Sequence, residues 1–168
     1  MDVTIEPATA SDFEQIARLF AEENRFHAEL LPGRFQVVDP IITHEWLEAV
    51  LSSSLKTLFV ARAAGQVVGV LLLQEMANPD DEIYRPRCYV YVDELMVARV
   101  YRGRGIGRRL MEAAEGRAQE LGIEEIELNV WERNLGAIAF YEHLGYTTVR
   151  RRMVRKSEVW GDTEGDSE

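Results

Sequence analysis

Residues 89–110 read YVYVDELMVARVYRGRGIGRRL, a stretch that passes from a strand pattern through a glycine-rich turn into a helix pattern. Its first part is rich in β-branched and aromatic residues and predicts a strand over 88–97. Its last part opens a helix predicted over 105–121, which Gly122 ends. Apolar residues recur along one face of that helix at helical spacing: Ile106, Leu110, Ala114, Ala118 and Leu121.

The turn between the strand and the helix has the composition of an anion site. Glycines at 103, 105 and 107 let the backbone approach a ligand closely, and the start of a helix adds a partial positive charge. Phosphate is the natural occupant. The dinucleotide pattern does not fit, because Arg108 stands where a glycine is needed, and the P-loop pattern fails because no Gly-Lys pair exists. There are two alternatives: a turn whose arginines are merely solvated, and an RNA-binding Arg-Gly segment, although RNA-binding segments of this kind are usually long and disordered.

Composition and charge narrow the class of protein. The 168 residues carry a formal net charge of -10, which argues against binding of nucleic acid or anionic lipid by the molecule as a whole. Residues 98–111 are the exception, with five arginines and no acidic residue, and they indicate a local polyanion site. No run of eighteen apolar residues occurs and residues 1–4 resemble no secretory signal, so we expect no membrane span and a cytoplasmic protein.

Cysteine and histidine, the usual ligands of zinc, are few in this sequence. Cys88 is the only cysteine, which excludes an internal disulfide and a multi-cysteine zinc site, and we expect it to be buried in its strand. His27, His44 and His143 have no ligand spacing, so they are expected to be solvated or packed, and no metal is expected.

The remaining patterns predict an α/β (α+β) protein with a mixed sheet and helices on both faces. Thr9 with Asp12 is a variant capping box for a helix running to about Leu30, and Asp39-Pro40 predicts the start of a second helix. The other predicted elements are strands at 3–6, 57–63, 66–75, 125–130 and 146–155, a hairpin turn at Ala64-Gly65, and a helix from the cap Asn134 to Leu144. We expect one domain over 1–156 and a disordered acidic tail over 157–168.

Two motifs together resemble the Gcn5-related N-acetyltransferase (GNAT) superfamily. Residues 102–107 match its pyrophosphate-binding signature, Gln/Arg-x-x-Gly-x-Gly/Ala, and 89–110 is similar to its fourth strand, bulge and third helix. Residues 129–146, NVWERNLGAIAFYEHLGY, look like the second family signature. The resemblance covers about residues 3–155 and implies the GNAT fold, a mixed, mostly antiparallel central sheet of about six to seven strands with helices on both faces.

The resemblance also implies acetyl-CoA as cosubstrate. In relatives, the fourth strand pairs through its backbone with the pantetheine arm, and the amides of the glycine turn hold the pyrophosphate. Asn134 would contact the pantetheine region, although its role as an ordinary helix cap is equally expected. The implied cofactor-binding residues are Leu95, Met96, Val97, Arg102, Gly103, Arg104, Gly105, Ile106, Gly107, Arg108, Asn134 and Ala137.

The implied activity is transfer of an acetyl group to a primary amine on a small amine, a polyamine, an amino acid or a protein. The attacking amine must lose a proton, and Asp93 or Glu94 is expected to accept it, with Glu127 in reserve. Asn129, which stands where some relatives carry the base, cannot serve. Tyr141 is the implied general acid, although the helical spacing also fits core packing. The alternative is a noncatalytic acyl-CoA-binding or interaction module on the same fold. The resemblance also implies a possible homodimer, because many relatives pair as dimers.

Overall fold

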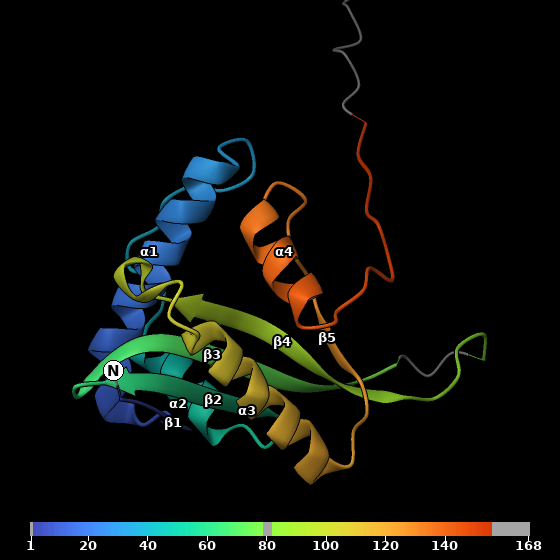
Figure 1. The fold of residues 1–168 in the computed structure, drawn as a ribbon, viewed down its shortest axis with the longest axis horizontal. Coiled ribbons are helices and arrows are strands. Elements are labelled where there is room, and N and C mark those ends of the chain that lie inside the picture. The colour runs from blue at the N-terminus through green and yellow to red at the C-terminus, as the bar shows by residue number, and fades with distance from the viewer. Residues whose placement is uncertain (1, 79–81, 156–168) are drawn as a thin grey trace, which may run out of the picture.

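The computed structural model describes residues 2–78 and 82–155, and the predicted acidic tail at 157–168 lies outside them. A five-stranded sheet forms the centre of the molecule, with the strands side by side in chain order (Figure 1). Each neighbouring pair is antiparallel except the last, which is parallel. The strands are β1 (Val3–Pro7), β2 (Lys56–Ala63), β3 (Gln66–Ala77), β4 (Cys88–Val97) and β5 (Ile126–Leu128).

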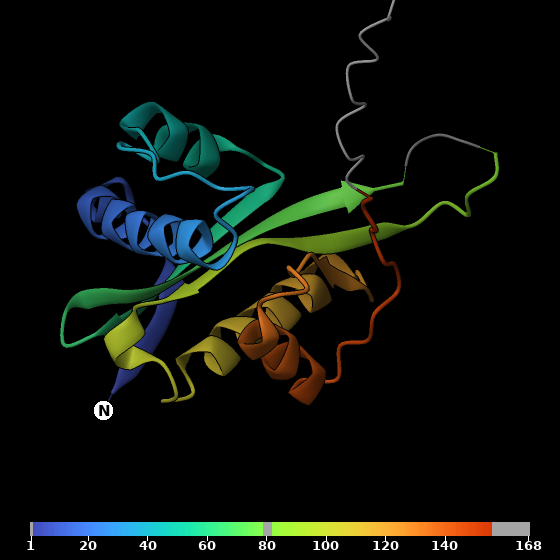
Figure 2. The ribbon, with the colours of Figure 1, turned by 90° about the horizontal axis from the view of Figure 1, so that it is seen from above.

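Helices cover both faces of the sheet, as predicted (Figure 2). On one face, α1 (Phe13–Leu30) and α2 (His44–Ser52) bury a core that includes Ile16 and Leu47. On the other face, α3 (Ile106–Leu121) buries its predicted apolar stripe, and α4 (Leu135–His143) packs beside the same core. The 3.6-residue spacing of apolar side chains is the reason that each long helix presents one face to the sheet.

Most of the predicted turns and caps are confirmed. Ala64 and Gly65 join β2 to β3 with φ of 47° and 79°, the left-handed conformation that a tight hairpin needs. The backbone N–H of Thr9 donates to the carboxylate of Asp12 at 2.9 Å, just before α1. Gly122 ends α3 with a φ of 67°.

The second predicted helix is present, but its predicted start is wrong, and so is the last predicted strand. The second helix begins at His44 rather than after Asp39-Pro40, because the Thr43 side chain caps it by accepting from the Trp46 backbone N–H at 3.2 Å. Residues 146–155 form no strand, so the described sheet has five strands rather than six or seven. An alternating apolar pattern becomes a strand only beside a partner edge, and the short strand β5 pairs with β4 alone. The apolar side chains of this segment, Val149, Met153 and Val154, remain exposed.

Candidate active site

A bulge in β4 decides where the two candidate carboxylates point. Leu72 of β3 pairs with Glu94 and Leu73 pairs with Val92, so Asp93 is an extra residue without a partner on β3. The bulge shifts the alternation of the strand by one residue. Val92 faces the α3 core, whereas Glu94 is opposite Leu72, which belongs to the α1–α2 core. Asp93 is therefore exposed, and Glu94 is partly buried on the α1 side.

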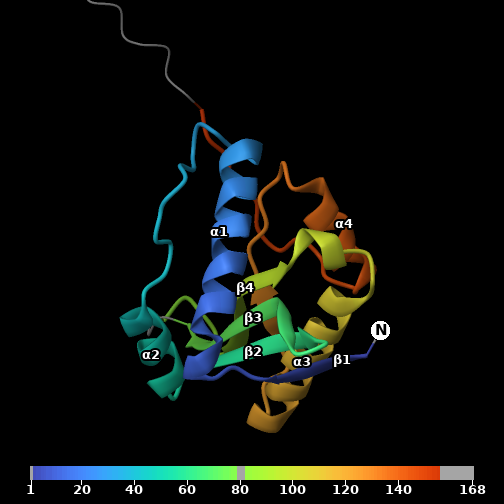
Figure 3. The same ribbon diagram turned by 90° about the vertical axis from the view of Figure 1, so that its left-hand side faces the viewer.

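Beyond the bulge, the outer edge of β4 is free of strand pairing within the described residues. β5 pairs only with residues 90–92, and the rest of β4 runs between α1 and α4 (Figure 3). The Ala98 N–H donates to the Val68 carbonyl at 2.9 Å. Because backbone groups alternate along a strand, those of Val97 and Leu95 point to the free edge, and those of Met96 point toward β3.

A short 3-10 helix (Arg99–Tyr101) connects the end of β4 to the glycine turn at the start of α3. Gly103 and Gly105 have φ of 72° and 79°, and a Cβ on either would meet no atom within 4 Å. Gly105 is the N-cap of α3 and offers no side-chain cap, and the helix bonding starts with the Arg109 N–H donating to the Gly105 carbonyl at 3.1 Å. The amides of the first turn, at residues 106–108, thus have no capping side chain, which suits an anionic ligand.

Gly107 has a different role from the two turn glycines. A Cβ on it would lie 3.2 Å from Cζ of Phe140, so its lack of a side chain lets α4 pack against the start of α3. The second signature helix is thereby placed beside the first.

The side chain of Arg102 turns away from this helix start. Its Nε donates to the Val97 carbonyl at 2.8 Å, its Nη2 lies 3.1 Å from Oε2 of Glu23 on α1, and its guanidinium lies 5.4 Å from the Phe26 ring centre. The other arginines of the turn also have local partners: Arg104 lies over the Tyr101 ring and Arg108 pairs with Glu112.

Glu94 and Tyr141 carry the strongest electrostatic perturbations of the site. Burial raises the pKa of Glu94 to about 7, and the carboxylates of Asp93 and Glu23 add to the rise. Burial also raises the pKa of Tyr141 above its ordinary value, with Tyr146, Glu23 and Glu94 contributing. Glu94 is therefore poised to exchange a proton near neutral pH, and Tyr141 keeps its proton.

The second signature forms the predicted capped helix, and its aromatic side chains pack against the core. The Asn134 side chain caps α4 by accepting from the Ala137 N–H at 3.2 Å. The Tyr141 ring contacts Phe140 and Tyr146 edge to face, at centroid distances of 5.1 Å and 5.8 Å. Tyr141 thus combines core packing with a hydroxyl that makes no hydrogen bond to the described part of the chain.

Glu127, the reserve candidate for the base, and Asn129, which cannot act as a base, both have partners away from Glu94. Glu127 is held by Arg87 at 2.6 Å, and the Asn129 side-chain amide donates to the Tyr91 hydroxyl at 2.8 Å. Neither arrangement provides a free carboxylate beside the open edge of β4.

Comparison with known proteins agrees with this geometry. A family model described as the acetyltransferase (GNAT) family matches residues 14–146. The chain belongs to this family. Over 93 residues it is 39% identical to a mycothiol acetyltransferase of Propionibacterium freudenreichii and to the N-alpha-acetyltransferase MAK3 of Arabidopsis thaliana. These matches span 55% of the chain, but only 28% and 46% of the two relatives, so the chain aligns with less than half of either.

Solved structures match the GNAT fold over nearly the whole chain. A mutant of the BH1408 protein of Bacillus halodurans superimposes with a TM-score of 0.88 at 26% identity, covering 92% of this chain and 99% of that one. AAC(6')-Iy, solved in complex with the bisubstrate analogue CoA-S-monomethyl-acetylneamine, superimposes with a TM-score of 0.70 at 18% identity, covering 94% of this chain and 99% of that one. The second likeness is one of fold.

The GNAT chain also has an aromatic cluster that its sequence did not predict. His27 contacts Phe26 and Phe35 at centroid distances of 5.5 Å and 5.2 Å, and Phe35 meets the Trp131 ring edge at 5.3 Å. The cluster joins the end of α1 to the loops before α2 and α4. Phe35 and Trp131 lie outside helices and strands, so the periodicity of the sequence did not indicate their contact. His27 is packed against two aromatic rings, which is one of the two environments expected for it.

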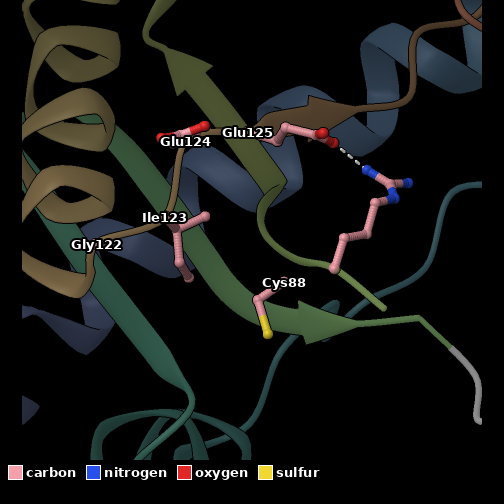
Figure 4. Close-up of a pocket in the computed structure, with 6 residues that line it drawn as sticks. Cys88, Gly122, Ile123, Glu124 and Glu125 are labelled. Atoms are coloured by element: carbon pink, nitrogen blue, oxygen red, sulfur yellow. Dashed lines mark hydrogen bonds and ion pairs between the residues drawn. The ribbon is translucent and has the colours of Figure 1, made fainter. Parts of the chain in front are cut away.

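A separate hollow lies at the opposite end of β4 from the glycine turn. It has a volume of about 260 Å³ and is lined by Arg87, Cys88 and residues 122–125, with Arg87 paired to Glu125 (Figure 4). Cys88 is exposed there, which corrects the expectation of a buried strand residue, because pairing with β5 begins only at Val90.

Within residues 2–78 and 82–155, no group of ligands is suited to a metal, and no helix is long and apolar enough to cross a membrane.

Proposed function

We propose that this GNAT-family chain transfers an acetyl group from acetyl-CoA to a primary amine. The observation that carries the proposal concerns β4 and the start of α3. Within the described residues, β4 has an edge without strand pairing from its bulge onward, and only a short 3-10 helix and the glycine turn separate it from an uncapped helix start. An extended pantetheine arm would add to that edge as a strand, through Leu95 and Val97, with Met96 between them. The amides from Gly103 to Arg108 would hold the pyrophosphate.

In this proposal, the amine nitrogen attacks the acetyl carbonyl carbon of the bound thioester, and the carbon–sulfur bond then breaks. Glu94 accepts the proton of the amine through water, for which a pKa of about 7 is well matched. Tyr141 gives its proton to the departing thiolate. A backbone N–H on the free edge of β4 stabilises the oxyanion that forms between these steps. Asp93 acts on Glu94 by its charge.

The test is a CoA-release assay with a panel of amines, together with calorimetry of CoA binding. We expect CoA to bind and at least one amine to be acetylated. CoA binding without turnover on any amine would instead support a noncatalytic acyl-CoA-binding module. Absence of CoA binding would overturn the proposal altogether.

A further inference from the structure

Glu23 and Phe26, one helical turn apart on α1, together form a cation site. The guanidinium of Arg102 fills it, 3.1 Å from the Glu23 carboxylate and 5.4 Å from the Phe26 ring centre. The Glu23 side chain is only 17% exposed, and His27 lies 3.7 Å from its second oxygen. A carboxylate beside an aromatic face is the combination that recognises an organic cation.

Arg102 is held at this site partly by a hydrogen bond to a backbone group that the cofactor would also use. Its Nε donates to the Val97 carbonyl, which points to the free edge of β4. Under the proposed function, the pantetheine arm pairs with that same edge, while the diphosphate lies at the start of α3, which begins four residues after Arg102. Phosphate is a strong partner for a guanidinium, so bound acetyl-CoA would draw Arg102 away from Glu23.

We propose that Glu23 and Phe26, once released by Arg102, bind a second cationic group of the acceptor, so that the acceptor is a diamine or an amine bearing a guanidinium. This inference rests on the proposed function. The reacting amine itself is not the group at Glu23, because an opposing carboxylate favours the charged ammonium, whereas attack needs the neutral amine. Glu94, across from α1 on β4, is the carboxylate that takes the proton of the reacting amine.

The experiment compares putrescine with n-butylamine, two acceptors with the same four-carbon chain, of which only putrescine has a second ammonium. At saturating acetyl-CoA, the native chain should have a kcat/KM for putrescine about tenfold or more above that for n-butylamine. Glu23→Gln should bring this ratio to about twofold or less, and Phe26→Leu should lower it by a smaller factor. Glu29→Gln is the matched control, because Glu29 is an exposed carboxylate on the same helix and should leave the ratio unchanged.

A second readout separates acceptor binding from damage to the fold. Because Glu23→Gln loosens the hold on Arg102, calorimetry should show CoA binding as tight as in the native chain or tighter. A ratio unchanged by Glu23→Gln, or CoA binding severalfold weaker in that variant, would overturn the inference. Equal acetylation of both amines by the native chain would also overturn it and leave the proposed function standing, whereas no acetylation of any amine would remove the proposed function.

Discussion

At the scale of single residues, Asp93 and Glu94 show how one bulge separates two neighbouring carboxylates. Asp93 is exposed at the bulge, and Glu94 is partly buried opposite Leu72, where burial and two nearby carboxylates raise its pKa to about 7. Glu94 is therefore about half protonated near neutral pH. The strand pattern alone left both residues as candidate bases, and the register of β4 distinguishes them.

The pH dependence of Glu94→Gln tests this distinction. Because a raised pKa keeps Glu94 protonated and inactive as a base below about pH 7, the kcat/KM of the native chain should carry a limb that rises with pH through that value. The ionisation of the amine affects the native chain and Glu94→Gln equally, so the ratio of their kcat/KM values at each pH reports the ionisation of Glu94 alone. We expect Glu94→Gln to lack the limb and to be about 10²-fold slower on its plateau.

Asp93→Asn provides the matched control for that measurement. Removing a nearby negative charge lowers the pKa of Glu94, so the limb should persist with its midpoint moved below about pH 7. If Asp93→Asn abolished the limb and Glu94→Gln kept it, the assignment of the base would be reversed.

Tyr141→Phe tests the general acid. The substitution removes only the hydroxyl, which makes no hydrogen bond to the described part of the chain, and keeps the ring contacts with Phe140 and Tyr146. Steady-state kinetics should show kcat about 10²-fold lower, while calorimetry gives a CoA affinity close to that of the native chain. Unchanged turnover would leave Tyr141 with packing as its role.

At the scale of elements, the start of α3 is built to be left open. Its N-cap is a glycine in the left-handed region, and no side chain in the described part of the chain supplies the acceptor that a helix start ordinarily has. The short distance between Gly107 and Phe140 anchors α4 beside the opening without closing it.

Gly105→Glu should abolish CoA binding, because the new side chain places a negative charge and added bulk where the diphosphate is expected. Gly65→Glu is a close control: Gly65 lies in the β2–β3 turn with the same φ of 79°, and a Cβ on it would likewise meet no atom within 4 Å. Both variants should lose about 1 kcal/mol or more of stability from backbone strain, measured by urea denaturation. Calorimetry showing equal CoA affinity for the two would contradict the site.

At the scale of the whole molecule, the sheet is buried by helices on both faces, so stability and site geometry depend on the same packing. Leu110 of α3 is fully buried against the sheet, and its Cδ1 would lie 3.1 Å from a Cβ on Gly69 of β3. This contact holds the helix that carries the glycine turn against the sheet.

Leu110→Ala should lower the free energy of unfolding by about 2–5 kcal/mol, because it leaves a cavity between α3 and the sheet. Leu135→Ala is the comparison: Leu135 is also a helical leucine but is 71% exposed, so its loss should cost about 0.5 kcal/mol or less. Similar losses for the two variants in urea denaturation would show that this core is not packed as described.

The local sequence was sufficient for the elements whose signals are local. Four such features were predicted: the bounds of β4, the apolar stripe of α3, the hairpin at Ala64-Gly65 and the cap at Asn134. They could be predicted because periodicity, turn residues and capping residues act within a few positions. The strand expected at 146–155 failed for the opposite reason, since a strand requires a partner edge that no local pattern supplies.

The sequence by itself determined the fold class, the family resemblance and the glycine turn at the start of α3. Only the tertiary structure decided that Glu94 rather than Asp93 faces α1, that Arg102 pairs with Glu23, and that Phe35 meets Trp131. Each of these depends on strand register or on contact between residues far apart in the chain. Such contacts follow from packing of the whole molecule, whereas turns, caps and helix faces follow from neighbouring residues.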